Sequence, residues 1–126
     1  MSIKKTIGGK LMANGKAVPV SRAVRAGDYV FVSGQLAFGD DGTIIDGDVT
    51  EQTTRVLEIM QMILREADCE MSDVVKCTCW IANADDFGAF NDAYAQFFGE
   101  EPPARSCVPS QLLLGGLVEI EAVAYK

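Results

Sequence analysis

The sequence contains no histidine among its 126 residues. This absence removes the side chain that most often titrates near neutral pH and most often binds metals, and with it every Ser-His or Cys-His nucleophile pair. Cations are also scarce, since 11 Lys and Arg stand against 18 Asp and Glu, for a net charge of −7. Phosphate backbones attract proteins mainly through Lys and Arg. The composition therefore argues against a dedicated nucleic-acid-binding protein.

Long apolar runs are missing as well, because no stretch reaches the ~20 residues that cross a bilayer. The first ten residues, MSIKKTIGGK, carry no signal segment, so we expect a cytoplasmic protein without membrane association. The cysteines include no C-x-x-C pair, and a lone C-x-C without histidine does not predict zinc or another metal. We interpret all four as reduced residues that pack as small apolar groups: Cys69, Cys77, Cys79 and Cys107.

What is present fits one folded domain, which we take as residues 1–126. The mass is 13.6 kDa, with 48% hydrophobic and 23% charged residues, values typical of a single globular domain. Strand patterns occupy 22–26, 28–35, 74–81, 104–108 and 118–125, and a turn is expected at 39–42. Two helical segments interrupt them, which predicts a mixed sheet with its helices on one face. Because no further helix covers the other face, we expect subunits to associate through it.

The first helix is indicated by Asp48 as N-cap and by Glu51, which completes a capping-box-like pair. Its apolar face then recurs at three- and four-residue steps: Val49, Thr53, Val56, Leu57, Met60, Ile63, Leu64 and Ala67. A second helix is expected to be capped by Asp85-Asp86 and stopped at Glu100–Pro103. It carries an aromatic stripe that we interpret as core: Phe87, Phe90, Tyr94, Phe97 and Phe98.

Two strands carry the residues best suited to chemistry. Period-two alternation places Arg105 and Cys107 on one face of their strand, and Glu119 and Glu121 on one face of the last strand. A guanidinium is costly to bury unless paired, and its planar fork suits a carboxylate. On the residues alone, two interpretations stay open: a structural Arg–Glu pair, or capture of a substrate carboxylate with a glutamate nearby as acid or base.

Blocks spread over roughly residues 19–125 resemble, in order, the Rid/YjgF family of reactive-intermediate deaminases. The most specific are P-A-R-S at Pro103–Ser106 and E-I-E-A at Glu119–Ala122. They are joined by weaker matches: Val32–Gln35, Gln52-Thr53, Asp73–Lys76, Asp86-Phe87, Asn91, Tyr94, Phe97 and Phe98. The resemblance implies an α+β, chorismate-mutase-like (YjgF-type) subunit, a mixed sheet of about six strands with two helices on one face. It also implies a homotrimer whose sheets form a central barrel, with clefts between subunits.

The resemblance further implies hydrolysis of enamine and imine intermediates, such as 2-aminoacrylate and 2-iminopropanoate, to 2-keto acids and ammonia. No metal or organic cofactor takes part. Arg105 matches the arginine that holds the substrate carboxylate, and Glu119 matches the glutamate associated with the catalytic water. Cys107 matches a cleft residue that acts mainly through its backbone. Further cleft positions match Ser33, Gly34 and Asn91.

Three segments near the cleft depart from the family pattern. Val20 stands where the family has a tyrosine, and Arg22 stands where it has a glutamine. A proline expected after S-G-Q is absent. The connection 109–116 is apolar and glycine-rich instead of polar. Positions 20 and 22 of an extended segment face the same side, so both are expected to border the substrate cleft unless Arg22 is a solvated arginine that pairs with an acidic residue, which is the alternative left open. An Arg22 at the cleft mouth favours imino acids larger than 2-iminopropanoate, including ones with a second carboxylate.

Other functions stay open beside the deaminase of 2-iminopropanoate type. One is a pathway-specific deaminase of another imine or enamine, such as 2-aminomuconate. Another is a non-catalytic trimer that binds small carboxylates such as keto acids. A ribonuclease or translation inhibitor fits less well, because RNA cleavage needs acid–base groups beside a phosphate in a chain of charge −7 without histidine.

Overall fold

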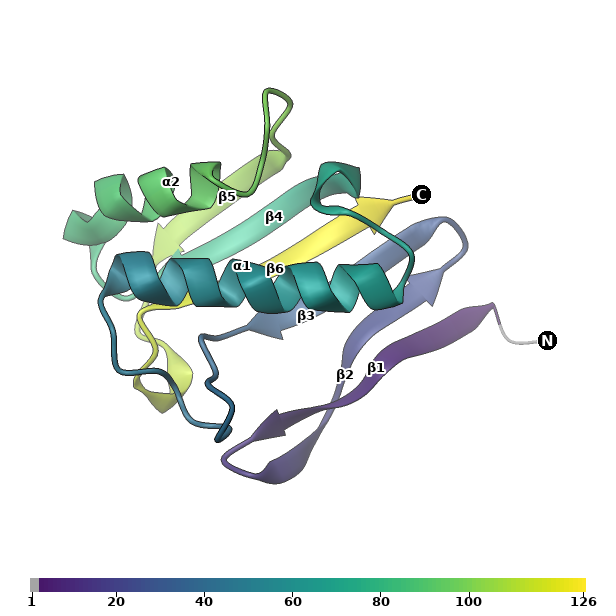
Figure 1. The fold of residues 1–126 in the computed structure, drawn as a ribbon, viewed down its shortest axis with the longest axis horizontal. Helices are drawn as coiled ribbons and strands as arrows, with labels where there is room; N and C mark the ends of the chain where they lie inside the picture. The colour runs from purple at the N-terminus through teal and green to yellow at the C-terminus, as the bar shows by residue number, and fades with distance from the viewer. Residues whose placement is uncertain (1–2) are drawn as a thin grey trace.

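Residues 3–126, which the computed structural model describes, form one mixed sheet with two α-helices (Figure 1). The sheet order is β1-β2-β3-β6-β4-β5, with every neighbouring pair antiparallel except β4 and β5. Three short 3₁₀ turns lie at 71–73, 84–86 and 113–115. The main elements are β1 (Lys4–Ala13), β2 (Lys16–Ala26), β3 (Tyr29–Gln35), α1 (Val49–Glu66), β4 (Val74–Ile81), α2 (Phe87–Ala95), β5 (Ala104–Pro109) and β6 (Val118–Tyr125).

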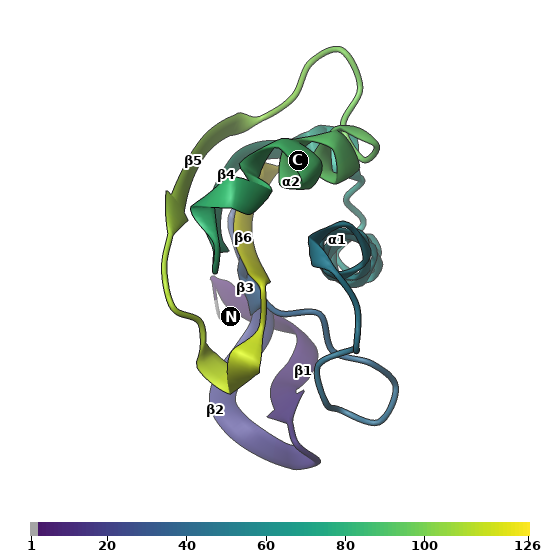
Figure 2. The ribbon, with the colours of Figure 1, turned by 90° about the vertical axis from the view of Figure 1, so that its left-hand side faces the viewer.

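Both helices lie on the same side of the curved sheet (Figure 2). This arrangement confirms the predicted α+β architecture with its helices on one face. The parallel β4–β5 pair is the one that needs a crossover, and α2 is the helix of that crossover. The crossover places α2 against the edge strand β5.

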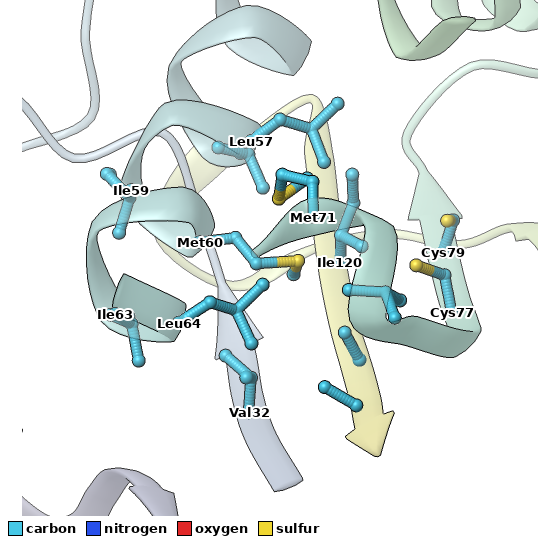
Figure 3. Close-up of a cluster of buried hydrophobic side chains, with 14 of the residues drawn as sticks. Val32, Leu57, Ile59, Met60, Ile63, Leu64, Met71, Cys77, Cys79 and Ile120 are labelled. Atoms are coloured by element: carbon cyan, nitrogen blue, oxygen red, sulfur yellow. The ribbon is translucent and has the colours of Figure 1, made fainter. Parts of the chain in front are cut away.

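The core forms between α1 and the sheet, as the helical spacing predicts. Leu57, Met60 and Leu64 are fully buried and face Val32 of β3 and Ile120 of β6 (Figure 3). Removing such side chains from water contributes about 1.5–3 kcal/mol each. The start of α1 is also as predicted, because the Asp48 carboxylate accepts from the Glu51 N–H and the Glu51 carboxylate accepts from the Asp48 N–H. Three cysteines lie in this core: Cys69, Cys77 and Cys79.

The second helix begins directly after Asp85-Asp86, as predicted, but ends earlier than expected. Asp86 occupies the N-cap position of α2 without a side-chain cap, and the Asn83 side chain accepts from the Asp85 N–H one turn earlier. The helix ends at Ala95, well before the prolines that we expected to stop it. Phe97 and Phe98 therefore follow the helix, and Phe98 still packs on the Tyr94 ring at 4.7 Å between centroids.

The N-terminal strand β1 is the element that the sequence patterns missed. It pairs with β2 through the two-residue turn Asn14-Gly15, whose φ angles are 51° and 78°. Asn-Gly with positive φ at both positions is the preferred two-residue hairpin turn. The Asn-Gly turn signal was thus present in the sequence. Because the hairpin pairs β2 with β1, β2 begins at Lys16 and not at the predicted residue 22.

The sheet face opposite the helices leaves apolar side chains exposed in the single chain. Tyr29, Phe31 and Tyr125 form an aromatic row on it, with 46%, 47% and 51% of their surface exposed. A contiguous apolar surface of this kind marks an interaction site. Within residues 3–126, no helix is long and apolar enough to span a bilayer.

Candidate functional site

Four of the predicted site residues line one cavity of about 540 Å³. Val20 comes from β2, Ser33 and Gly34 from β3, and Glu119 from β6. The remaining wall is almost wholly apolar and includes residues that the sequence analysis did not assign: Leu11, Ala13, Val18, Leu36, Phe38, Leu113 and Leu114. The cavity thus presents one ionisable group within a wall of hydrocarbon.

That ionisable group is the Glu119 carboxyl. Burial raises its pKa above the ordinary glutamate value, and the neighbouring Glu121 carboxylate raises the pKa further. Burial acts because a low-dielectric surrounding disfavours the charged form, and a like charge nearby acts in the same direction. A carboxylate with a raised pKa is a stronger base for a proton of bound water.

The Glu119 carboxylate can occupy its position only because residue 34 is a glycine, without a β-carbon. A β-carbon at residue 34 would collide with Glu119 Oε2 and lie 3.2 Å from Glu119 Cδ. Next to it, the Ser33 hydroxyl donates to the Ser21 carbonyl at 2.6 Å. This bond uses the hydroxyl proton, so toward any further partner the Ser33 oxygen can act only as a hydrogen-bond acceptor.

Arg105 lies elsewhere in the same chain, against α2. Its guanidinium carbon is 4.7 Å from the centroid of the Tyr94 ring, 5.4 Å from that of Phe90 and 5.7 Å from that of Phe87. Cations over aromatic rings at such distances are attracted by the ring quadrupole. Among residues 3–126 no carboxylate forms an ion pair with Arg105. The structural Arg–Glu pair considered above is therefore not seen in the chain, and the fork of Arg105 is left for another anion.

Two further predicted residues accompany Arg105. Cys107 faces the same side of β5, half-buried, and burial raises its thiol pKa although the Arg105 charge lowers it. A raised pKa keeps the thiol protonated at neutral pH, which does not suit a nucleophile. Asn91 follows Phe90 on α2 and shares a helix face with Phe87 and Tyr94 by its spacing. Its Oδ1 is buried and accepts no hydrogen bond from the described residues.

The two groups of residues lie on opposite faces of the sheet. Arg105 and Cys107 pair across to Cys77 and Cys79, which point into the core under the helices. Glu119 pairs across to Trp80 of β4 on the other face. Cross-strand partners share a face, so Arg105 and Glu119 of one chain do not meet. The predicted site residues thus form two separate groups within the chain.

Arg22 and Val20 do not border the same cavity, contrary to the expectation from the sequence that both line the substrate cleft. Arg22 lines a separate cavity with residues of α1, whereas Val20 lines the Glu119 cavity. The alternation rule requires regular pairing. The β1–β2 register shifts twice here, between Ile7 and Lys10 and between Lys10 and Met12. The two side chains therefore serve different cavities, and Arg22 offers no second charge to the Glu119 cavity.

No group of three or more Cys, Asp or Glu side chains within residues 3–126 is placed to hold a metal ion. The polar groups of the Glu119 cavity are one carboxylate, one hydroxyl and backbone atoms. Such a set suits orienting and deprotonating a water molecule beside an apolar ligand.

Comparison with known proteins gives a consistent result. The family model described as Endoribonuclease L-PSP matches residues 12–126. A RutC family protein of Pyrococcus abyssi is 43% identical over 110 residues, which cover 86% of this chain and 87% of the relative. A 2-iminobutanoate/2-iminopropanoate deaminase of Capra hircus is 39% identical over 110 residues, or 86% of this chain and 80% of that protein.

Solved structures show the same fold. RidA from an Antarctic Psychrobacter species aligns with a TM-score of 0.87 at 31% identity, covering 97% of this chain and 99% of that one. The TdcF protein of E. coli, crystallised with bound serine, aligns with a TM-score of 0.85 at 34% identity, covering 97% and 98%. The six-stranded sheet with two helices is therefore shared along nearly the whole chain.

Proposed function

The chain belongs to the Endoribonuclease L-PSP family, that is, to the Rid/YjgF proteins, and from this premise we propose that it is a deaminase of imino acids. The reaction converts a 2-imino acid and water into a 2-keto acid and ammonia. The observation that carries the proposal is the Glu119 carboxyl, half-buried in an apolar cavity that raises its pKa. Relatives that carry the name 2-iminobutanoate/2-iminopropanoate deaminase support it.

In the proposed mechanism, Glu119 accepts a proton from a water molecule as that water attacks the imine carbon. A protonated imine is already electrophilic, so an oriented water and a modest base are enough. The attack forms a C–O bond and moves the C=N electron pair onto nitrogen. The resulting carbinolamine then takes a proton on its nitrogen and loses a proton from its hydroxyl. The C–N bond breaks, and ammonia leaves with the bond pair while C=O forms.

Arg105 binds the substrate carboxylate through its planar fork in this proposal. The three aromatic rings beside it hold the guanidinium without neutralising it, so its charge is available to the substrate. Because Arg105 and Glu119 lie on opposite faces within a chain, we place the complete site between two copies. Glu119, Ser33 and Gly34 come from one copy, and Arg105, Cys107 and Asn91 from the next, in the homotrimer that the exposed aromatic face supports.

The substrate side chain is proposed to be apolar and larger than a methyl group. Val20 and the leucines of the 113–115 turn leave hydrocarbon where the substrate side chain extends. The second carboxylate that Arg22 was expected to recognise is not supported, because Arg22 lines another cavity. An aminomuconate-type dicarboxylate is disfavoured for the same reason.

Activity is tested with imines generated by an amino acid oxidase from alanine, leucine, methionine and glutamate, with catalase present to remove peroxide. We expect keto-acid release above the spontaneous rate, with the leucine- and methionine-derived imines favoured over the glutamate-derived one. No acceleration with any of them would contradict the deaminase assignment. Keto-acid binding without turnover would then indicate the carboxylate-binding trimer, and cleavage of RNA would indicate the ribonuclease.

The site between copies is tested by mixing two inactive variants. Arg105→Ala and Glu119→Gln chains are co-expressed with different tags and purified as mixed assemblies. A site between copies can combine the intact Glu119 of one chain with the intact Arg105 of the other. In a trimer that contains both variants, one of the three sites regains both groups. No recovery in mixed assemblies, or a mass by light scattering that differs from about three times the 13.6 kDa chain, would contradict the arrangement.

A further inference from the structure

A second cavity, of about 310 Å³, lies on the helix side of the sheet between β2, α1 and the loop of residues 36–44. Nothing in the proposed deaminase mechanism uses it. Its wall combines cations, an anion, an amide and thioethers: Arg22, Arg55, Asp40, Gln35, Met12 and Met62. Ligand cavities of about 300–1,000 Å³ with a few convergent polar groups are typical of small-molecule sites, and this one lies at the small end.

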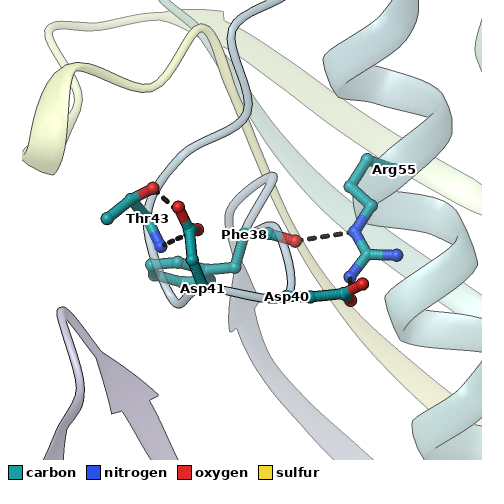
Figure 4. A network of polar contacts seen from close by, with 5 residues as sticks. All are labelled: Phe38, Asp40, Asp41, Thr43 and Arg55. Carbon is teal, nitrogen blue, oxygen red and sulfur yellow. Dashed lines mark hydrogen bonds and ion pairs between the residues drawn. The ribbon is translucent and has the colours of Figure 1, made fainter.

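Two of the five arginines of this acidic chain face the cavity. Arg55 Nε donates to the Phe38 carbonyl at 2.6 Å, and its Nη2 lies 3.5 Å from Asp40 Oδ1 (Figure 4). The Asp40 side chain is fully exposed, so this ion pair contributes little to stability and leaves the Arg55 guanidinium able to bind another anion. Arg22 makes no hydrogen bond or ion pair with any residue of the described part of the chain.

Gln35 adds an unmet acceptor to these cations. Its side chain is fully buried and borders the cavity. Its Nε2 donates to the Ser33 carbonyl at 3.0 Å, whereas its Oε1 accepts no hydrogen bond within residues 3–126. A buried acceptor without a donor destabilises the folded protein, and such groups are rare in folded proteins. A donor brought by a ligand relieves this cost.

We propose that this cavity is a binding site for a free α-amino acid with an apolar side chain. The carboxylate pairs with Arg22 and Arg55. The ammonium group supplies the donor that Gln35 Oε1 lacks and also meets Asp40 at the rim. The apolar side chain packs on the thioethers of Met12 and Met62, which are 40% and 52% exposed and suited to irregular ligands. Each polar group of the zwitterion thus finds a partner of opposite character.

The site is connected to the Glu119 cavity by two contacts. Phe38 borders both cavities, and Gln35 holds the carbonyl of Ser33, whose residue lines the Glu119 cavity. A ligand that fixes Gln35 and Phe38 therefore acts on the wall beside Glu119. We infer that amino-acid binding changes turnover of imino acids, a consequence that rests on the proposed function, whereas binding itself does not.

Methionine methyl groups report on this site directly. Protein labelled with ¹³C at the methionine methyls is titrated with L-leucine and followed by NMR. Met12 and Met62 border the cavity, while Met60 and Met71 are buried in the core and serve as internal controls. We expect saturable shifts of the Met12 and Met62 signals at millimolar leucine and unchanged Met60 and Met71 signals. The readout needs no catalysis, so its failure is separate from failure of the deaminase assignment.

Variants and ligand analogues sharpen the result. Arg22→Gln is expected to weaken leucine binding at least about tenfold, while Arg65→Gln, which removes an exposed arginine of α1 outside the cavity, leaves it unchanged. 4-Methylpentanoate, which lacks the amino group, is expected to bind more weakly. The proposal is overturned by the absence of saturable shifts, by equal binding of 4-methylpentanoate, by shifts with inorganic phosphate alone, or by unaltered binding in Arg22→Gln with intact core signals.

Discussion

The Glu119 carboxylate lies against the backbone of Gly34, in the space that a β-carbon at residue 34 would occupy. The two residues belong to neighbouring strands, β6 and β3, whose pairing shifts register between Val32 and Gln35. A shift of register displaces the strands locally. The absent side chain of Gly34 then lets the carboxylate lie close to the backbone of β3, in the cavity that Ser33 also lines.

Gly34→Ala should therefore damage activity without unfolding the protein. The new methyl group meets the far end of a flexible glutamate side chain, so the carboxylate moves away and the backbone does not. We expect kcat to fall by at least about tenfold, because the catalytic group is misplaced. The midpoint of thermal unfolding should change little. Gly88→Ala is the matched control, because a β-carbon there meets nothing within 4 Å. Equal kinetics in the two variants would remove the carboxylate from the mechanism.

Arg105 should be hard to replace, even by another cation. Arg105→Ala is expected to lower kcat/KM by a factor equivalent to about 2–4 kcal/mol of transition-state binding, the scale of truncating a buried charge contact. Arg105→Lys should recover only part of this loss, because an ammonium lacks the bidentate fork. Steady-state kinetics with the leucine-derived imine measure both losses. Full recovery by lysine would indicate a point-charge role and would not support a carboxylate fork.

The sequence predicted most of the elements but not how they bring the site together. The β4 and β6 bounds and the capping box of α1 are as predicted, because hydrophobic alternation and capping are local signals. The alternation also placed Arg105 and Glu119 correctly on their own strands. Their location on opposite faces depends on the sheet order, in which β6 lies between β3 and β4. That order is a long-range property with no local signal.

Arg22 shows where a local rule failed for a local reason. Alternation predicts one side for Val20 and Arg22, yet the pairing leaves residues 18–20 of β2 opposite Leu11 alone in β1. Extra residues in one strand break the correspondence between position and face in that strand. Predicting this irregularity required the hairpin partner β1, which the sequence patterns did not reveal.

Neutralising Glu121 should shift the acid limb of the pH–activity profile toward lower pH. As a base, Glu119 works only when ionised, so the rate falls as pH drops through its pKa. The Glu121 charge contributes to raising that pKa. Glu121→Gln removes the like charge, lowers the pKa of Glu119 and moves the acid limb of kcat toward lower pH.

A pH–rate profile of Glu121→Gln beside Glu58→Gln checks this, since Glu58 is an exposed glutamate of α1 outside the cavity. Coincident profiles of the parent and both variants would show that Glu121 does not act on the base. A shift toward higher pH in Glu121→Gln would contradict the assignment of Glu119 as the group that must be ionised.

Leu114 allows stability and specificity to be separated. Its φ of 61° lies in the left-handed region, which is unfavourable for a branched side chain and costs about 1–3 kcal/mol. The side chain is 49% exposed, so core packing does not explain why a leucine stands here. It does line the Glu119 cavity, together with Leu113. We interpret the strained leucine as part of the wall that receives the substrate side chain.

Leu114→Gly should accordingly leave the free energy of unfolding nearly unchanged, because relief of the left-handed strain offsets the greater chain entropy of glycine. The same change opens the apolar wall. We expect kcat/KM for the leucine-derived imine to fall about tenfold, because the variant loses apolar contacts with a substrate side chain of several carbons. The alanine-derived imine, which lacks such a side chain, should be affected much less. The ratio of the two substrates within one variant cancels differences in folding or assembly. If that ratio matches the parent, the substrate side chain does not reach residue 114, and the apolar wall has a structural role alone.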